Sequence, residues 1–253
     1  MAISFRTGGA GDGPRVVLVH GLGATNRVWD DLIAALDPSW GWIAPDLPGH
    51  GESAPPSEAY SFSGLAAALA AVLDEGRPIT VLGHSLGGVV GLELASGAYG
   101  IPVTGVCGLG IKVRWTDDEL AKAAALASRP SRTYATRAEA VDRALKVAGV
   151  TGLVDPDSPA ATSAVTESAD GWQLAMDPRG FAVGRPDMRT LLAAARAPVV
   201  LAAGERDPMS PVEHLRDLVR EPVILPGLGH NAQVEGPAAV VSILESLRGG
   251  PRR

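Results

Sequence analysis

Short apolar runs alternate with helix-like segments along the amino-terminal part of the chain. The runs contain consecutive apolar residues, which is typical of strands covered on both faces. Between them, apolar residues recur every three or four positions, as on one face of a helix. This alternation predicts crossover units and a parallel sheet. The predicted strands are Arg15–His20, Trp42–Asp46, Pro78–Gly83 and Val103–Leu109, and the predicted helices include Ser63–Glu75 and Leu86–Ala95.

The alternation stops between residues 112 and 188 and then resumes. Within that stretch we expect no strand, and Asp117–Ala127 and Ala138–Val147 are predicted to be helices. After it come predicted helices at 188–196, 211–219 and 237–247 and predicted strands at 198–203 and 222–225. The chain is therefore predicted to be an α/β protein with a mostly parallel central sheet flanked by helices. Its core comprises residues 1–111 and 189–253, and residues 112–188 form a mainly helical insertion.

Composition and charge narrow the class of protein. The 253 residues fit one large domain, and 46% are hydrophobic against 20% charged, as in a globular protein with a substantial core. The net charge of -6 offers no basic surface for a nucleic-acid partner. We find neither a secretory signal pattern nor an apolar stretch of the roughly 18 residues that a membrane span needs, so we expect a cytoplasmic protein. The single cysteine, Cys107, excludes an internal disulfide and is predicted to be a small buried side chain.

The segment Gly83-His-Ser-Leu-Gly87 carries the strongest chemical signal. It matches the motif G-x-S-x-G and lies where that motif must lie, after a predicted strand and before a predicted helix. A serine hydroxyl is a poor nucleophile unless it is held in place and deprotonated. A sharp turn from strand to helix exposes Ser85, and its strained backbone tolerates only small neighbours, which accounts for the two flanking glycines. We therefore predict that Ser85 is a nucleophile.

With these residues the chain resembles the α/β-hydrolase family, and the resemblance covers nearly all of it except the insertion. The resemblance implies a catalytic acid after a late strand and a histidine base after the last strand. Asp207 and His230 hold these places, and the order Ser85, Asp207, His230 is the order of the family. Glu205 is the nearest competitor for the acid, but the family pattern G-x-x-D favours Asp207.

The resemblance also assigns the backbone N–H groups of Leu22 and Leu86 to an oxyanion hole. Leu22 lies in His20-Gly-Leu-Gly, which resembles the family's turn after an early strand. Two donors matter because the tetrahedral intermediate concentrates charge on one oxygen. We predict structural roles for His20, which supports this turn, and for Asp46–Ser53, which resembles a family loop beneath the site.

The resemblance implies that the insertion is a helical cap that shapes the substrate pocket. A helix through residues 171–176 would place Trp172 and Met176 on one face, one turn apart. The alternative, that this face packs the cap onto the core, stays open. Lys112 and Arg114 are the candidates for binding a substrate carboxylate. The apolar candidates for the pocket lining are Trp115, Leu126, Trp172, Met176 and Phe181.

The function implied is that of a serine hydrolase that cleaves a small carboxylic ester or lactone through an acyl-enzyme on Ser85. No metal or other cofactor is expected, since no set of His, Asp and Glu residues has metal-ligand spacing. Three alternatives use the same triad: a hydrolase of C–C bonds in a diketone-type substrate, an acyltransferase, and a ligand receptor or regulator with slow turnover.

Overall fold

A seven-stranded sheet forms the centre of the protein in a computed structural model, which describes residues 2–248. The strand order is β1-β3-β2-β4-β5-β8-β9, with β1 antiparallel to β3 and every other pair parallel. This confirms the predicted fold class. The sequence prediction lacks β1 because that strand, Phe5-Arg-Thr-Gly-Gly, has no apolar run and is mostly exposed. The strands are β1 (Phe5–Gly9), β2 (Arg15–Val19), β3 (Gly41–Pro45), β4 (Ile79–His84), β5 (Val103–Leu109), β8 (Val199–Gly204) and β9 (Val223–Leu225).

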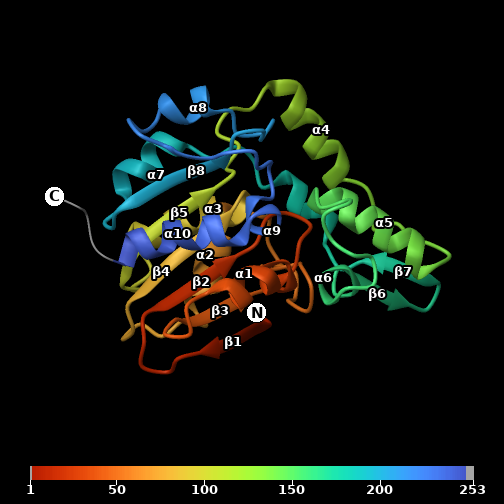
Figure 1. Cartoon of the computed structure of the whole chain (residues 1–253). Coiled ribbons are helices and arrows are strands. Elements are labelled where there is room, and N and C mark those ends of the chain that lie inside the picture. Colours follow the sequence, from red (N-terminus) through yellow and green to blue (C-terminus); the bar gives the residue numbers. More distant parts are fainter. Residues whose placement is uncertain (1, 249–253) are drawn as a thin grey trace.

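Helices cover both faces of the sheet, as the continuous apolar runs predict. Alternate residues of a strand point to opposite faces. In β2, Val16 and Leu18 pack into one buried cluster, whereas Val17 and Val19 pack into another. In Figure 1, α1 and α10 lie in front of the sheet, on the face of the first cluster. The helices of the first face are α1 (Asp30–Ala35) and α10 (Pro237–Arg248), and those of the second are α2 (Phe62–Ala70), α3 (Leu86–Ala95), α7 (Met188–Ala194) and α8 (Val212–Arg216).

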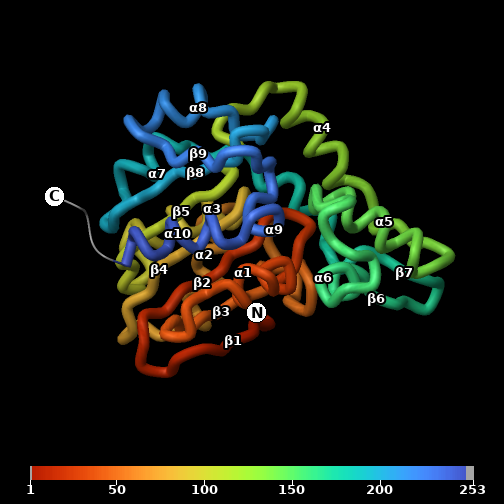
Figure 2. The backbone as a smooth tube through the Cα atoms, in the orientation of Figure 1, coloured from red at the N-terminus to blue at the C-terminus, as the bar shows by residue number. Residues whose placement is uncertain are grey.

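The chain between β5 and α7, which we call the inserted segment, leaves the sheet and folds beside it. It lies at the right of Figure 1, and Figure 2 traces its path out from the sheet and back. Helices α4 and α5 each begin with a capping box, Thr116 with Glu119 and Thr136 with Glu139. The segment contains α4 (Asp117–Ala127), α5 (Arg137–Ala148), α6 (Pro159–Thr162), β6 (Val165–Ser168), β7 (Gly171–Leu174) and the 3-10 helix η2 (Pro178–Ala182); two further short elements outside it are η1 (Asn26–Trp29) and α9 (Ala232–Glu235).

The expectation of no strand in the inserted segment is wrong, and so is that of a helix through residues 171–176. Strands β6 and β7 form an antiparallel hairpin in which Ser168 lies opposite Gly171 across a two-residue turn. Gly171 has a φ of +133°, a value that residues with a side chain rarely adopt. This backbone conformation is not helical, and it lets the chain enter β7 directly after the turn. Trp172 and Tyr134 then exchange backbone hydrogen bonds of 2.7 and 2.9 Å, which extend the hairpin with a third piece of chain.

The inserted segment shares a hydrophobic core with the sheet. The buried face of α5 includes Val141 and Leu145, which belong to the same cluster as Trp29 and the β2 residues of the first face. This continuous packing fixes α5 relative to the sheet. Within residues 2–248, no helix combines the length and the apolar character needed to cross a bilayer.

Candidate active site

Ser85 lies at the turn between β4 and α3, at the carboxyl end of the sheet. Its φ of +50° and ψ of −113° make it the one residue other than glycine with a positive φ in the described part of the chain. Such a conformation costs about 1–3 kcal/mol and persists only where the surroundings impose it. The Ser85 N–H donates to the Leu109 carbonyl (2.8 Å), and the Gly88 N–H donates to the Ser85 carbonyl (3.0 Å). These bonds hold the half-buried serine at the tip of the turn.

Gly83 and Gly87 allow the close approach of strand and helix at this turn. A Cβ on Gly83 would overlap the Gly87 carbonyl oxygen, and a Cβ on Gly87 would overlap the carbonyl oxygen of Val19 in β2. Both obstacles are backbone atoms, which cannot rotate away as a side chain can. The need for small residues beside Ser85 therefore has a direct steric cause.

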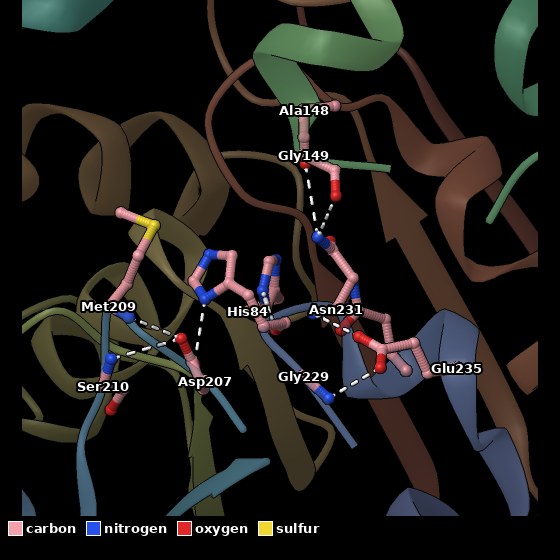
Figure 3. Close-up of polar contacts among 11 residues, drawn as sticks. His84, Ala148, Gly149, Asp207, Met209, Ser210, Gly229, Asn231 and Glu235 are labelled. Carbon is pink, nitrogen blue, oxygen red and sulfur yellow. Dashed lines mark hydrogen bonds and ion pairs between the residues drawn. The ribbon is translucent and has the colours of Figure 1, made fainter. Parts of the chain in front are cut away.

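Asp207 and His230 form a hydrogen-bonded pair in the loops that follow β8 and β9. His230 Nδ1 lies 2.9 Å from Asp207 Oδ2, and the Asp207 side chain is fully buried. Its other oxygen, Oδ1, accepts the N–H groups of Met209 (2.8 Å) and Ser210 (3.2 Å), as Figure 3 shows. Both carboxylate oxygens are therefore engaged. Since a carboxylate only accepts hydrogen bonds, the Nδ1–H of His230 is the donor to Asp207, and a neutral His230 ring then has its acceptor at Nε2.

The loop after β5 brings the serine and this pair to one edge of the sheet. Leu109 accepts the Ser85 N–H, and the next residue, Gly110, lies beside the pair. A Cβ on Gly110 would come 3.3 Å from Asp207 Oδ2 and 3.4 Å from His230 Nδ1. Parallel strands end at the same edge of a sheet, which is where ligand sites of such folds form. The structure thus gathers Ser85, Asp207 and His230 from three separate loops.

The turn Gly21–Gly23, which follows β2, borders Ser85 from the other side. A Cβ on Gly21 would lie 3.4 Å from Ser85 Cβ. Leu86 is the first residue of α3, where N–H groups have no partner within the helix. In the part of the chain that the structure describes, the backbone N–H of Leu22 and that of Leu86 make no hydrogen bond. Neither donor is therefore occupied in the described part of the chain.

Three further histidines are buried around the site and stay neutral at pH 7. His20 receives the Leu47 N–H at Nε2 (2.9 Å), and its Nδ1 lies 2.8 Å from the Gly21 carbonyl oxygen, so it supports the turn. Burial lowers the pKa of His20 to about 4 and that of His50 to about 3. Burial, followed by the charge of His230, also lowers the pKa of His84 well below its usual value. Among residues 2–248, no three His, Cys, Asp or Glu side chains are placed to hold a metal ion.

Two residues that the sequence analysis did not single out hold the loop that carries His230. Glu235, at the end of α9, accepts the N–H groups on both sides of the histidine, from Gly229 (2.6 Å) and from Asn231 (3.1 Å). The Asn231 side chain donates to the Gly149 carbonyl at the end of α5 (3.0 Å). Figure 3 shows these contacts. One sequence signal could have identified Glu235: it follows His230 by five positions, so its carboxylate can reach back to the backbone of the histidine's loop.

The predicted lining residues of the inserted segment divide into two groups. Met176, Phe181 and Leu126 border a cavity of about 810 Å³. Trp172 does not border it and packs through the hairpin against the core. Trp115 also lies outside it, with its Nε1 donating to the Lys112 carbonyl (3.0 Å).

The two predicted carboxylate-binding residues have other partners. Lys112 pairs with Glu119 and lies over the Trp115 ring, 4.7 Å from its centre. Arg114 pairs with Asp217. Neither cation borders the 810 Å³ cavity.

Comparisons with known proteins agree with this architecture. A model described as the alpha/beta hydrolase family matches residues 16–243. A pimeloyl-[acyl-carrier protein] methyl ester esterase of Neisseria meningitidis serogroup A is 33% identical over 210 residues, which are 78% of this chain and 63% of that protein. An uncharacterized protein of Mycobacterium bovis is 43% identical over 89 residues, 34% of this chain and 26% of its own length, so the aligned part spans less than two thirds of either relative. An esterase structure from Mycobacterium tuberculosis shares the fold, with a TM-score of 0.73 at 24% identity over 98% of this chain and 92% of that one.

Proposed function

Because the chain belongs to the α/β-hydrolase family, we propose that it is a serine hydrolase that cleaves a small carboxylic ester or lactone through an acyl-enzyme on Ser85. The observation that carries this proposal is the strained turn at Ser85 beside the Asp207–His230 pair. Backbone strain of this kind is concentrated at functional sites. An ester as substrate is supported by the relative in Neisseria, whose name specifies a methyl ester esterase.

The proposed reaction begins with proton transfer from Ser85 Oγ to His230 Nε2 as Oγ attacks the carbonyl carbon. The imidazolium that forms keeps its Nδ1–H on Asp207, whose negative charge stabilises it. The tetrahedral intermediate then expels the alcohol, which takes the proton from His230, and the acyl group remains on Ser85. Water, deprotonated by His230, attacks this acyl-enzyme. The second tetrahedral intermediate then breaks its bond to Ser85 Oγ, which takes the proton back from His230 as the acid is released.

The negative oxygen of each tetrahedral intermediate is proposed to accept the N–H groups of Leu22 and Leu86. Leu86 follows Ser85 directly and Leu22 follows Gly21, whose Cβ position lies 3.4 Å from Ser85 Cβ, and neither N–H has an acceptor in the described chain. The positive end of α3 adds to the attraction, because the helix begins at Leu86. Losing one such donor typically lowers the rate by about 10²–10³.

We propose that residues 112–188 act as a cap on a core formed by 1–111 and 189–253, of which residues 1 and 249–253 lie outside the described part. Two close approaches support this. Val147 Cγ1 lies 2.6 Å from the position of a Cβ on Gly23, and Leu22 Cδ1 lies 3.5 Å from that of a Cβ on Gly180. A cap that touches the proposed oxyanion turn would exclude water from one side of the substrate.

A purified Ser85→Ala variant tests the proposal. Without the nucleophile, hydrolysis of a short p-nitrophenyl ester should fall at least about thousandfold, and labelling by a fluorophosphonate should disappear. Ser57→Ala, at an exposed serine, is the matched control and should retain both. Full hydrolysis or labelling by a Ser85→Ala protein with an unchanged circular dichroism spectrum would exclude Ser85 as the nucleophile.

A further inference from the structure

The cavity bordered by Met176 and Phe181, which we call the cap cavity, carries charges that the proposed reaction does not use. Its walls are the end of α4, the loop 129–135, one face of α5 and the chain from Leu174 to Phe181. The whole chain has a net charge of -6, so an excess of cations here is a local feature. The charged residues that border the cap cavity are Arg129, Arg132, Arg143 and Lys146, against Glu139 and Asp142.

One face of α5 connects these charges to the proposed oxyanion turn. Residues 139, 142, 143, 146 and 147 border the cap cavity, and their spacing of three and four places them on one side of the helix. At the inner end, Val147 meets Gly23, the neighbour of Leu22. Arg143 lies one turn away from Val147, about 6 Å along the helix axis. The α5 wall of the cap cavity therefore runs from a contact with the proposed oxyanion turn, at Val147, toward Arg143.

The acidic side chains of the cap cavity are already engaged, and Arg132 lies over the Tyr134 ring, 4.9 Å from its centre, whereas in the described chain Arg129 and Arg143 have no side-chain partner. Asp142 pairs with Lys146 (2.6 Å), and Glu139 accepts the Thr136 N–H (3.3 Å) in the capping box of α5. Across residues 2–248, the ion pairs include none with Arg129, Arg132 or Arg143. An anion that enters the cap cavity would therefore meet guanidinium groups without displacing another carboxylate.

We propose that the cap cavity binds a carboxylate carried by the substrate, several bonds away from the carbonyl that Ser85 attacks. This inference rests on the proposed function, because it names the substrate class of that site. A guanidinium group matches a carboxylate with two parallel N–H donors. Met176, which borders the cavity, also approaches the oxyanion turn: its Cε and Leu22 Cδ1 lie 3.7 and 3.5 Å from the position of a Cβ on Gly180, where His50 Cε1 lies at 3.8 Å. The substrate class is thus an ester with an ionised acid group at the far end of an apolar chain.

The experiment measures kcat/KM for two series of methyl esters of increasing chain length. Half-esters of dicarboxylic acids end in a carboxylate, and esters of monocarboxylic acids end in a methyl group. At a length that spans the cap cavity, we expect the half-ester to be preferred about tenfold, the ratio that one charge-assisted hydrogen bond supplies. Added salt should reduce the preference, because the arginines are exposed. A third series, acetate esters of ω-hydroxy acids, carries the carboxylate on the alcohol part and shows which part of the substrate enters the cavity.

The Arg129→Gln/Arg143→Gln double variant should bring the ratio of the two series toward one. The matched control is Arg216→Gln/Arg220→Gln, which removes two exposed charges in and after α8 and should preserve the ratio. Equal rates for the paired esters in the wild-type protein, or a preference that survives in the Arg129/Arg143 variant, would overturn the proposal and leave these arginines as a hydrated surface. Failure of the proposed function is distinct, since the wild-type protein would then turn over no ester of any series.

Discussion

The loops around Ser85 and the cap cavity differ in what holds them together. Around Ser85, backbone atoms set the geometry: carbonyl oxygens leave no room for a Cβ on Gly83 or Gly87, and Asp207 is fixed by two N–H groups. The cap cavity is bordered instead by exposed side chains such as Arg129 and Arg143. The contrast places the proposed reaction and the proposed substrate preference in separate parts of the molecule. Changes at the first region should alter stability and kcat, and changes at the second should alter substrate preference.

The largest effect should come from pH, acting on the buried histidines near Ser85. His20 has a pKa of about 4 in the folded protein, against about 6.5 in the unfolded chain. Between these values the unfolded chain binds a proton that the folded protein does not, so the free energy of unfolding falls as the pH is lowered. His20 alone should account for about 3 kcal/mol between pH 6.5 and 4.

His50 and His84 act in the same direction as His20, and the buried carboxyl of Asp46, whose pKa is raised, acts in the opposite one. Urea unfolding at a series of pH values measures the effect. A His20→Gln variant should show a shallower slope, whereas Arg143→Gln should keep the wild-type slope. A wild-type unfolding free energy that is flat over this range would contradict the assignment of His20 as buried and neutral.

Next in size is the substitution Gly87→Ala, because the new Cβ meets the Val19 carbonyl and cannot be accommodated by a side-chain rotation. Overpacking of this kind costs about 1–3 kcal/mol, and we expect ester hydrolysis to fall as the turn at Ser85 shifts. Gly11→Ala is the control, since a Cβ at Gly11 meets nothing within 4 Å. Equal unfolding free energies for the two variants, measured by urea unfolding, would show that the turn is not tightly packed.

The third prediction concerns Glu235→Gln, which tests whether the loop of His230 needs its carboxylate. The amide keeps the size of the side chain but offers one acceptor oxygen to two N–H groups, so the loop loses one bond. A misplaced base lowers kcat. We expect kcat to fall about tenfold, or up to about hundredfold if the imidazole shifts by about 1 Å, with KM little changed. Glu213→Gln, at an exposed residue of α8, should match the wild-type protein. A rise in KM with kcat unchanged would place Glu235 in substrate binding instead.

The smallest effect is expected in the inserted segment, for Thr136→Ala. This substitution removes the side-chain cap of α5 and should lower the free energy of unfolding by about 1 kcal/mol. Ser131→Ala, at an exposed serine in the same segment, should change it by less than about 0.5 kcal/mol. Thermal unfolding of the two variants measures the difference. A loss for Thr136→Ala as large as that for Gly87→Ala would erase the contrast between the two regions.

The fold and the loop positions of the site could be predicted because local sequence signals determine them. Continuous apolar runs indicate a covered parallel sheet, and Ser85, Asp207 and His230 each follow such a run. The hairpin β6–β7 escaped prediction because each strand is only four residues long and has no apolar run. The arginines of the cap cavity escaped because an unpaired exposed arginine has no sequence signature. Only the folded chain shows that Lys112 and Arg114 are paired elsewhere while Arg129 and Arg143 border one space.

Helix α5 serves both regions, because one side of it borders the cap cavity and its carboxyl end accepts a hydrogen bond from Asn231. Asn231 is the neighbour of His230, so this hydrogen bond joins the wall of the cap cavity to the loop of the proposed base. A tilt of this helix would change the cavity and the position of the imidazole together. The hydrogen bond between the Asn231 side chain and the Gly149 carbonyl therefore couples the position of His230 to the shape of the cap cavity.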